Sequence, residues 1–233
     1  MIGSLLGLNH CPAFLRPVCG GMTVVAAFVL VLALAPPAFA SADARPSFFQ
    51  SRETLSTNMK PFKKWIAAIQ RYSKEAAEAK KGGCNKKELN KCQYEKWTQY
   101  LIGLKGKPPM EQIKGVNDYM NQAPYITDDN NWGKKDYWAS PGEFMTRFGD
   151  CEDYAIAKFL SLLRLGFKAE QLRVVGVKDL NLKIGHAVLI VLLDGKALVL
   201  DNQIKTVVDA ARVRHYQPVF SINTKAWWRH RPL

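Results

Sequence analysis

Apolar side chains recur at helical spacing over three stretches in the first half of the chain. Residues 61–79 and 91–104 each carry an apolar stripe, and Pro108–Pro109 open a third such stretch that closes before Pro124. The spacing predicts three amphipathic helices, the first ending at Gly82–Gly83. We expect their aromatic residues to form core rather than a ligand cage. The stripes are Phe62, Trp65, Ile66, Ile69, Tyr72 and Ala76; then Tyr94, Trp97, Leu101 and Leu104; then Ile113, Val116 and Met120.

The second half of the chain is rich in β-branched and aliphatic runs. Leu172–Val177 is typical of a strand, and so are Ile184–Leu193 and Ala197–Asp201. The last two are joined by Asp194–Gly195, a dipeptide that favours a tight hairpin. Residues 219–229 are expected to add a final strand. Helices followed by an antiparallel sheet indicate the α+β class.

One cysteine lies where a loop enters a further predicted helix. The segment Gly149–Lys158 begins with Asp150, a good N-cap, and Asp153 three residues later resembles a capping-box partner. The helix should end at Gly166. Cys151 then occupies the first helical turn, where the helix dipole favours an anionic thiolate, so we interpret Cys151 as a nucleophile. The plainer alternative is that Cys151 is a small buried apolar residue.

The predicted hairpin places a histidine and an aspartate on one face of the sheet. If Asp194 and Gly195 are the two loop residues, Val188 pairs with Asp201, and His186 is its diagonal neighbour. Diagonal positions lie about 7–8 Å apart, within reach of an imidazole and a carboxylate. A register shift of one residue would put the two side chains on opposite faces.

Cys151, His186 and Asp201 together fit a cysteine–histidine–acid triad. The thiol would attack a carbonyl, His186 would move the proton, and Asp201 would fix the imidazole tautomer. Backbone N–H groups at the helix start would hold the oxyanion. Taken singly, a histidine in an apolar strand is more often a core residue and an aspartate at a strand end a turn residue. A zinc site made of the same three residues lacks a fourth ligand.

The first forty residues have the features of a secretory signal peptide. Arg16 precedes the apolar run Met22–Ala35, and Ala38-Phe39-Ala40 fits a cleavage site. The run is shorter than the about 20 residues that span a bilayer, so an uncleaved anchor is the minor alternative. Met22 is an alternative start, but it would leave no basic n-region. We therefore predict a signal peptide over 1–40, an irregular arm over 41–60 and a single domain over 61–233.

Charge and cysteine content fit an exported protein. The formal net charge is +13, which favours an acidic partner or an anionic surface. Export and the absence of a recognisable motif argue against nucleic acid. Three cysteines follow the predicted signal peptide, and Cys84 and Cys92 are close enough in sequence for a local disulfide. Cys151 would then be the leftover thiol.

Four segments carry a resemblance to the bacterial transglutaminase-like cysteine peptidases. They are Trp138–Pro141, Gly149–Lys158, Gly185–Leu189 and Val199–Asn202, although the family usually has Thr where this chain has Ser140. The resemblance implies a papain-like, transglutaminase-type core, with a helical lobe bearing the cysteine packed on an antiparallel sheet. It also implies a periplasmic endopeptidase that cleaves the N-terminal region of a large surface adhesin and so promotes biofilm release. A membrane-bound cyclic-di-GMP receptor would be its inhibitory partner.

The same resemblance implies dependence on Ca²⁺. By matching position, Asp150 and Glu152 are the expected ligands and Asp153 a third, which competes with the capping role of Asp150 and Asp153. Like charges raise the pKa of an acid, so these carboxylates should disfavour the Cys151 thiolate and a bound Ca²⁺ should offset this. The loop Asp128–Gly133 lacks the ligand spacing of an EF-hand, and by itself is weak evidence for calcium.

Two further functions fit the same residues. A transglutaminase uses such a triad to pass the acyl group to an amine instead of water. A non-catalytic periplasmic calcium-binding adaptor would retain the fold with a vestigial triad.

Overall fold

The computed structural model describes residues 48–81 and 89–233. The predicted signal peptide and Cys84 lie outside these residues. Within them the helices are α1 (Lys63–Ala79), α2 (Leu89–Leu104), α3 (Pro109–Met120), α4 (Asp128–Trp132), α5 (Pro141–Arg147) and α6 (Cys151–Leu165). The strands are β1 (Ser51–Ser56), β2 (Leu172–Asp179), β3 (Ile184–Leu193), β4 (Lys196–Leu200), β5 (Val208–Asp209), β6 (Tyr216–Ile222) and β7 (Trp227–Pro232). Short 3-10 helices span Ala169–Gln171 and Ala210–Arg212.

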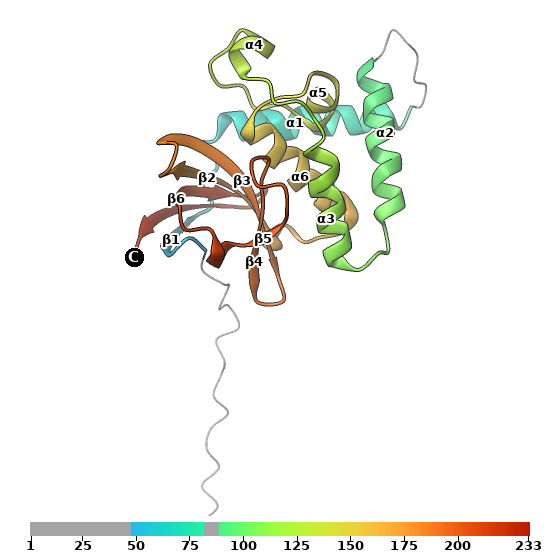
Figure 1. Cartoon of the computed structure of the whole chain (residues 1–233). Helices are drawn as coiled ribbons and strands as arrows, with labels where there is room; N and C mark the ends of the chain where they lie inside the picture. The colour runs from blue at the N-terminus through green and yellow to red at the C-terminus, as the bar shows by residue number, and fades with distance from the viewer. Residues whose placement is uncertain (1–47, 82–88) are drawn as a thin grey trace, which may run out of the picture. The chain divides into compact units, whose positions relative to one another are not determined.

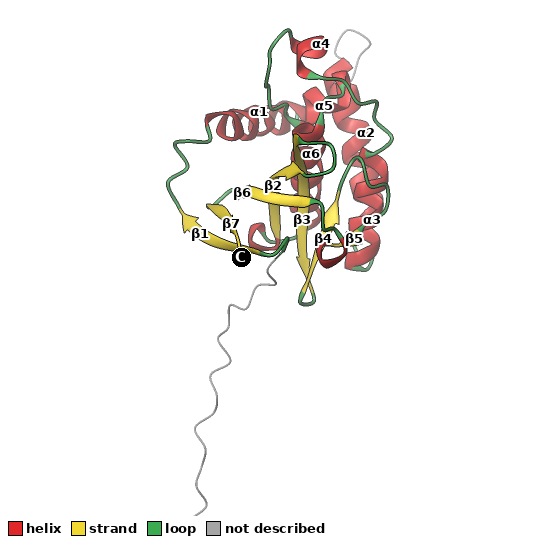
Figure 2. Ribbon diagram, turned by 60° about the vertical axis from the view of Figure 1, so that its left-hand side comes forward, coloured by secondary structure: helices red, strands yellow, loops and turns green. Residues whose placement is uncertain are grey.

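The strands form one antiparallel sheet in the order β1-β7-β6-β2-β3-β4-β5. The helices gather on one side of it, as Figures 1 and 2 show, with α6 packed against β3 and β2 on one side and α3 and α5 on the other. This arrangement is the predicted α+β fold, a helical lobe on an antiparallel sheet. The long central strands β2 and β3 therefore sit directly beneath the helix that begins with Cys151.

Two apolar clusters cover the two faces of the sheet. The larger one joins the helices to the sheet and includes the predicted aromatic stripes, with Trp65 and Trp97 almost fully buried. The smaller one lies around Val188 and Val199 and includes Phe49 and Tyr216. Alternate residues of β3 enter the two clusters, which explains why this strand is apolar along most of its length.

The β3–β4 hairpin has the register that its sequence predicts. Leu193 pairs with Lys196 and Leu189 with Leu200, so Asp194 and Gly195 form the two-residue loop. Both loop residues have positive φ, 48° and 71°, as a type I′ turn requires. This turn geometry matches the twist of the flanking strands and fixes which residues face each other.

Three expectations about local structure are wrong. Residues 51–56 of the predicted irregular arm form β1, because Ser51–Ser56 pair with β7 at the edge of the sheet. Residues 219–229 are not one strand: β6 and β7 are separate, and the Asn223 side chain accepts from the backbone N–H groups of Lys225 and Ala226 in the turn between them. The predicted loop Asp128–Gly133 contains a short helix, α4.

In the described residues, no helix is both long enough and apolar enough to cross a lipid bilayer.

Candidate active site and cation cluster

Helix α6 begins at Cys151, as the capping pattern predicts. Asp150 is the N-cap, with extended backbone, and its backbone N–H donates to Oδ2 of Asp153 over 3.3 Å. The helix ends at Gly166, whose φ of 103° lies in the left-handed region. The thiol of Cys151 is half-buried and free, at the N-terminal end of a helix whose other residues are mostly core.

Gly149 allows the turn into α6 to close tightly. A Cβ atom at this position would lie 2.0 Å from Oδ2 of Asp153, a side chain with no measurable exposure. The backbone oxygen of Gly149 also accepts from the backbone N–H of Ile126, 2.9 Å away, which joins this turn to the segment before α4. A side chain at position 149 would therefore displace the residues that shape the start of α6.

His186 and Asp201 form a buried hydrogen-bonded pair. Nε2 of His186 lies 2.9 Å from Oδ1 of Asp201, and the two residues are 5% and 1% exposed. Asp201 directly follows β4, and its carbonyl oxygen accepts from the side chain of Asn121, the C-cap residue of α3, over 2.7 Å. The predicted diagonal placement is thus confirmed, since the β3–β4 register brings both side chains to one face.

The hydrogen bonds of Asp201 set the charge of the pair. Burial alone would raise the pKa of Asp201. The pKa is nevertheless lowered, because Asp201 accepts hydrogen bonds from His186, the backbone N–H of Gln203 and the Tyr216 hydroxyl, and because the charge of His186 favours the carboxylate. Asp201 is therefore a carboxylate that accepts the proton on Nε2 of His186. Nδ1 is then the nitrogen that carries the lone pair, and the side-chain amide nitrogen of Gln203 lies 3.4 Å from it.

The Cys151 sulfur lies against the strand that carries His186. The backbone of Ala187, the next residue of β3, hydrogen-bonds to the thiol and favours its thiolate. Opposing this, burial and then the charge of Glu152 and Asp150 raise the pKa of Cys151 far above its ordinary value. The sulfur also lies 3.2 Å from Oε2 of Glu152. The expected repulsion of the thiolate by neighbouring carboxylates is thus present.

Several carboxylates crowd together beside the thiol. Ligand oxygens of Asp128, Asp150 and Asp153 lie within 4.8 Å of one another, and so do those of Asp128, Asp136 and Glu152. Burial, followed by the charge of Glu152, raises the pKa of Asp150 to about 7. Burial likewise raises the pKa of Asp128 to about 6. Without a compensating positive charge, such a cluster holds its anionic form only at a cost.

Two oxygens of this cluster have no partner among the described residues. Oδ1 of Asp128 and Oδ1 of Asp150 are buried and accept no hydrogen bond. Buried polar atoms are nearly always satisfied, so this pair marks a place for a group that the protein chain does not supply. Hard carboxylate oxygens are the ligands that Ca²⁺ prefers, and the residues present therefore fit a calcium ion.

Two more acidic residues of the cluster, Asp153 and Asp136, already have partners. Asp153 accepts from the backbone N–H of Ala139 over 2.6 Å with Oδ1 and from that of Asp150 with Oδ2. The first bond joins the Trp138–Pro141 segment to the start of α6. The second bond is the capping contact that the sequence predicts. Asp136 is about half exposed and forms an ion pair with Lys64 of α1.

Sequence reasoning missed the contribution of Asp128 and Asp136. Asp128 lies in the predicted loop Asp128–Gly133 and Asp136 lies just after it, whereas an EF-hand takes its ligands from one continuous segment. In the folded chain both residues instead add carboxylates to those at the start of α6. The signal available was the acidic run at Asp128–Asp129 ahead of an acidic helix start, yet nothing in the sequence shows that the two meet.

Comparison with known proteins identifies the family of this chain. Residues 79–229 match the family of bacterial transglutaminase-like cysteine proteinases (BTLCP). The chain belongs to this family. It is also similar to LapG of Legionella pneumophila, with 30% identity and a TM-score of 0.57 over 68% of this chain and 87% of that one. Structures of the same Legionella protein described as calcium-bound and EGTA-treated match with the same identity and TM-score, covering 87% and 84% of those chains. No curated protein sequence matches this chain.

Membership of the BTLCP family confirms the predicted class of enzyme. The chain is a transglutaminase-like cysteine peptidase, with the α+β fold that the sequence predicts. A cysteine peptidase needs a nucleophilic thiol and a base beside it. The start of α6 offers a free thiol, and the buried His186–Asp201 pair offers an imidazole held by a carboxylate.

Proposed function

We propose that this protein is a calcium-dependent periplasmic endopeptidase that cleaves the N-terminal region of a large surface adhesin. Cys151 would be its nucleophile, His186 its general base and acid, and Asp201 the residue that orients His186. One observation supports this most strongly: the Cys151 sulfur contacts the backbone of Ala187, next to a histidine already paired with a buried carboxylate. The proposed substrate follows from the family resemblance of the four sequence segments.

In the proposed reaction, Nδ1 of His186 takes the proton of the Cys151 thiol. The thiolate attacks the scissile carbonyl, and backbone N–H groups at the start of α6 stabilise the oxyanion. The imidazolium then returns its proton to the leaving amine, which departs and leaves a thioester. Water, activated by the same Nδ1 atom, hydrolyses the thioester and restores the thiol. Asp201 keeps the proton on Nε2 throughout.

Asp128, Asp150 and Glu152 would hold the calcium ion, with Asp136 and Asp153 at the edge of the site. When bound, the ion supplies positive charge that offsets the carboxylates around Cys151. The two unpartnered oxygens of Asp128 and Asp150 support this assignment. The calcium-bound and EGTA-treated structures of the Legionella relative support the choice of calcium as the ion. Asp153 then acts chiefly as a structural residue, through its two backbone hydrogen bonds.

The proposed cell biology rests on the sequence. The signal-peptide features of residues 1–40 support export to the periplasm. The resemblance of four segments of the sequence to the family implies the inhibitory partner that we propose, an inner-membrane cyclic-di-GMP receptor that sequesters the protease when adhesion is favoured.

One incubation tests the proposal. The N-terminal segment of a candidate adhesin is mixed with the protein, with calcium or with EGTA, and cleavage is followed by mass spectrometry. We expect cleavage with calcium only, and none by Cys151→Ala. In cells, adhesin processing that persists with Cys151→Ala would favour the adaptor function instead. Stable incorporation of a labelled amine into a glutamine peptide, without cleavage, would favour a transglutaminase.

A further inference from the structure

Tyr216 contacts Asp201 of the candidate triad from a strand that is not adjacent to β3 or β4. It is the first residue of β6, which pairs with β2 rather than with β3 or β4. Its hydroxyl donates to Oδ2 of Asp201 over 2.7 Å, whereas Oδ1 of Asp201 accepts from His186 and from the backbone of Gln203, each at 2.9 Å. Both oxygens of the carboxylate are thus held, one by β3 and its own loop and the other by β6.

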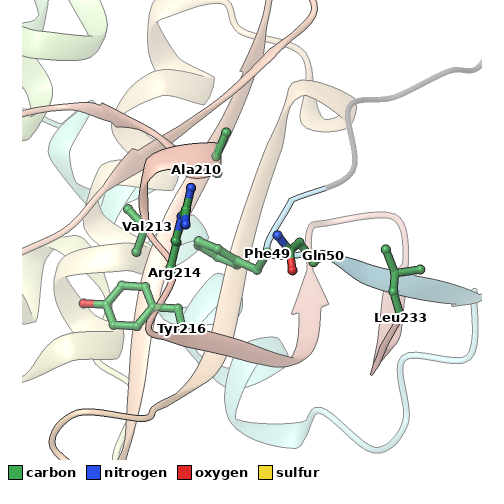
Figure 3. Close-up of a pocket in the computed structure, with 8 residues that line it drawn as sticks. Phe49, Gln50, Ala210, Val213, Arg214, Tyr216 and Leu233 are labelled. Atoms are coloured by element: carbon green, nitrogen blue, oxygen red, sulfur yellow. The ribbon is translucent and has the colours of Figure 1, made fainter.

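The ring of Tyr216 is fixed by its neighbours. Its centroid lies 5.6 Å from that of His186, and Phe49 packs edge-on against it with a centroid distance of 5.8 Å. Tyr216 and Phe49 both line a cavity of about 520 Å³, together with Val213, Arg214 and Leu233. Figure 3 shows the hydroxyl oxygen of Tyr216 pointing away from Gln50 and Leu233. Burial and the hydrogen bond with Asp201 raise the Tyr216 pKa, so the hydroxyl remains a donor.

A carboxylate held at one oxygen only can rotate about its Cβ–Cγ bond. The donor at Oδ2 opposes that rotation and keeps Oδ1 directed at Nε2 of His186. The tautomer of His186 follows from this bond, because a proton fixed on Nε2 leaves the lone pair on Nδ1.

We propose that Tyr216 is a positioning residue of the active site, which holds Asp201 so that His186 keeps its proton on Nε2 and presents Nδ1 to the sulfur. The inference rests on the proposed function for its effect on catalysis. The tautomer of His186 can be measured without a substrate, and so tests the inference separately.

The test uses Tyr216→Phe, which removes the hydroxyl and keeps the ring contacts with His186 and Phe49. The matched control is Tyr100→Phe, which removes a hydroxyl that donates over 2.9 Å to the carbonyl of Gly115, between α2 and α3. Both variants lose one tyrosine hydroxyl hydrogen bond. They differ in what that bond holds.

We expect NMR of ¹⁵N-histidine-labelled protein to show Nε2–H of His186 exchanging with water about tenfold faster in Tyr216→Phe. On a cleavable substrate, kcat should fall about tenfold with KM within twofold. Combining Tyr216→Phe with Asp201→Asn should slow the enzyme no further than Asp201→Asn alone, since the hydroxyl acts through that carboxylate. Tyr100→Phe should match the wild type in all three measurements.

Unchanged Nε2–H exchange and unchanged kcat in folded Tyr216→Phe would overturn the inference. If wild-type protein cleaves nothing, the proposed function fails, and the exchange measurement alone decides the role of Tyr216. If Tyr216→Phe does not fold, 3-fluorotyrosine at position 216 replaces it. That residue keeps the shape and donates more strongly, which makes Asp201 a weaker acceptor and should move the Nε2–H resonance of His186 upfield. An unmoved resonance then overturns the inference.

Discussion

Oδ1 of Asp201 lies 2.9 Å from Nε2 of His186, although His186 belongs to β3, Asp201 directly follows β4, and the two residues do not face each other directly. The pair depends on the two-residue turn at Asp194–Gly195, because a register shift of one residue would separate the two side chains. In the proposed mechanism this bond selects the nitrogen of His186 that serves as the base.

Asp201→Asn should therefore inactivate the enzyme and leave the fold intact. An amide that donates to His186 favours the wrong tautomer, so kcat should fall on the order of 10³-fold or more, with little change in KM. Steady-state kinetics with the cleavable adhesin segment measures this. The matched control is Asp194→Asn, which removes the same charge from the turn of the same hairpin and should retain activity. Full activity in Asp201→Asn would contradict the triad.

The role of Asp128 can be separated from a general effect of charge in its loop. Asp128→Asn should weaken calcium binding by about 10–100-fold, because the buried oxygen left without a partner then belongs to a neutral amide. Isothermal titration calorimetry with calcium alone measures this. The neighbouring Asp129 is exposed, and Asp129→Asn makes the same change without touching the cluster. Equal affinities for the two variants would remove Asp128 from the cation site.

Gly149 should tolerate no side chain. Gly149→Ala places a Cβ atom 2.0 Å from the Asp153 carboxylate, which is enclosed and cannot move aside, so we expect a loss of about 2 kcal/mol or more in the free energy of unfolding. Urea denaturation measures it. Gly103→Ala is the control: nothing lies within 4 Å of a Cβ atom there, and alanine in α2 should stabilise by about 0.5–1 kcal/mol. Equal stabilities would show that the turn can open.

His230 should make stability fall in mild acid. Burial lowers its pKa to about 4, from an unfolded value of about 6.5, and its ring nitrogens each lie 2.8 Å from a serine hydroxyl, of Ser51 and Ser221. Between these two pKa values the unfolded chain binds more protons, so the free energy of unfolding decreases as the pH drops from about 6.5 towards 4. The expected contribution is on the order of 2 kcal/mol near pH 5.

His230→Gln should flatten that part of the stability curve, measured by urea denaturation at a series of pH values. His215→Gln makes the same change at a half-exposed histidine and should leave the slope in place. A slope that survives in His230→Gln would assign the acid sensitivity to other groups. The carboxylates of the cation cluster are the same in both variants, so the comparison isolates His230.

Much of the fold followed from local patterns. The stripes of α1 to α3, the cap and stop of α6 and the turn at Asp194–Gly195 appear close to where the sequence places them. The sequence patterns did not predict the short elements. β1 has no apolar alternation of its own and forms only because β7 offers it an edge, and α4 and α5 are too short to show a helical period.

The disulfide expected at Cys84 concerns a residue outside the described part of the chain. Its predicted partner, Cys92, is disulfide-bonded. Of the cysteines in the described residues, Cys151 has a free thiol, as predicted.

The sequence by itself determined the start of α6 at Cys151 and the placement of His186 beside Asp201, because caps and tight turns act through backbone groups only a few residues apart. Only the tertiary structure decided that the sulfur meets β3, that Asp128 joins Asp150, and that Tyr216 reaches Asp201. Those contacts depend on how α6 packs on the sheet and on the order of its strands. Neither is encoded in any short stretch of residues.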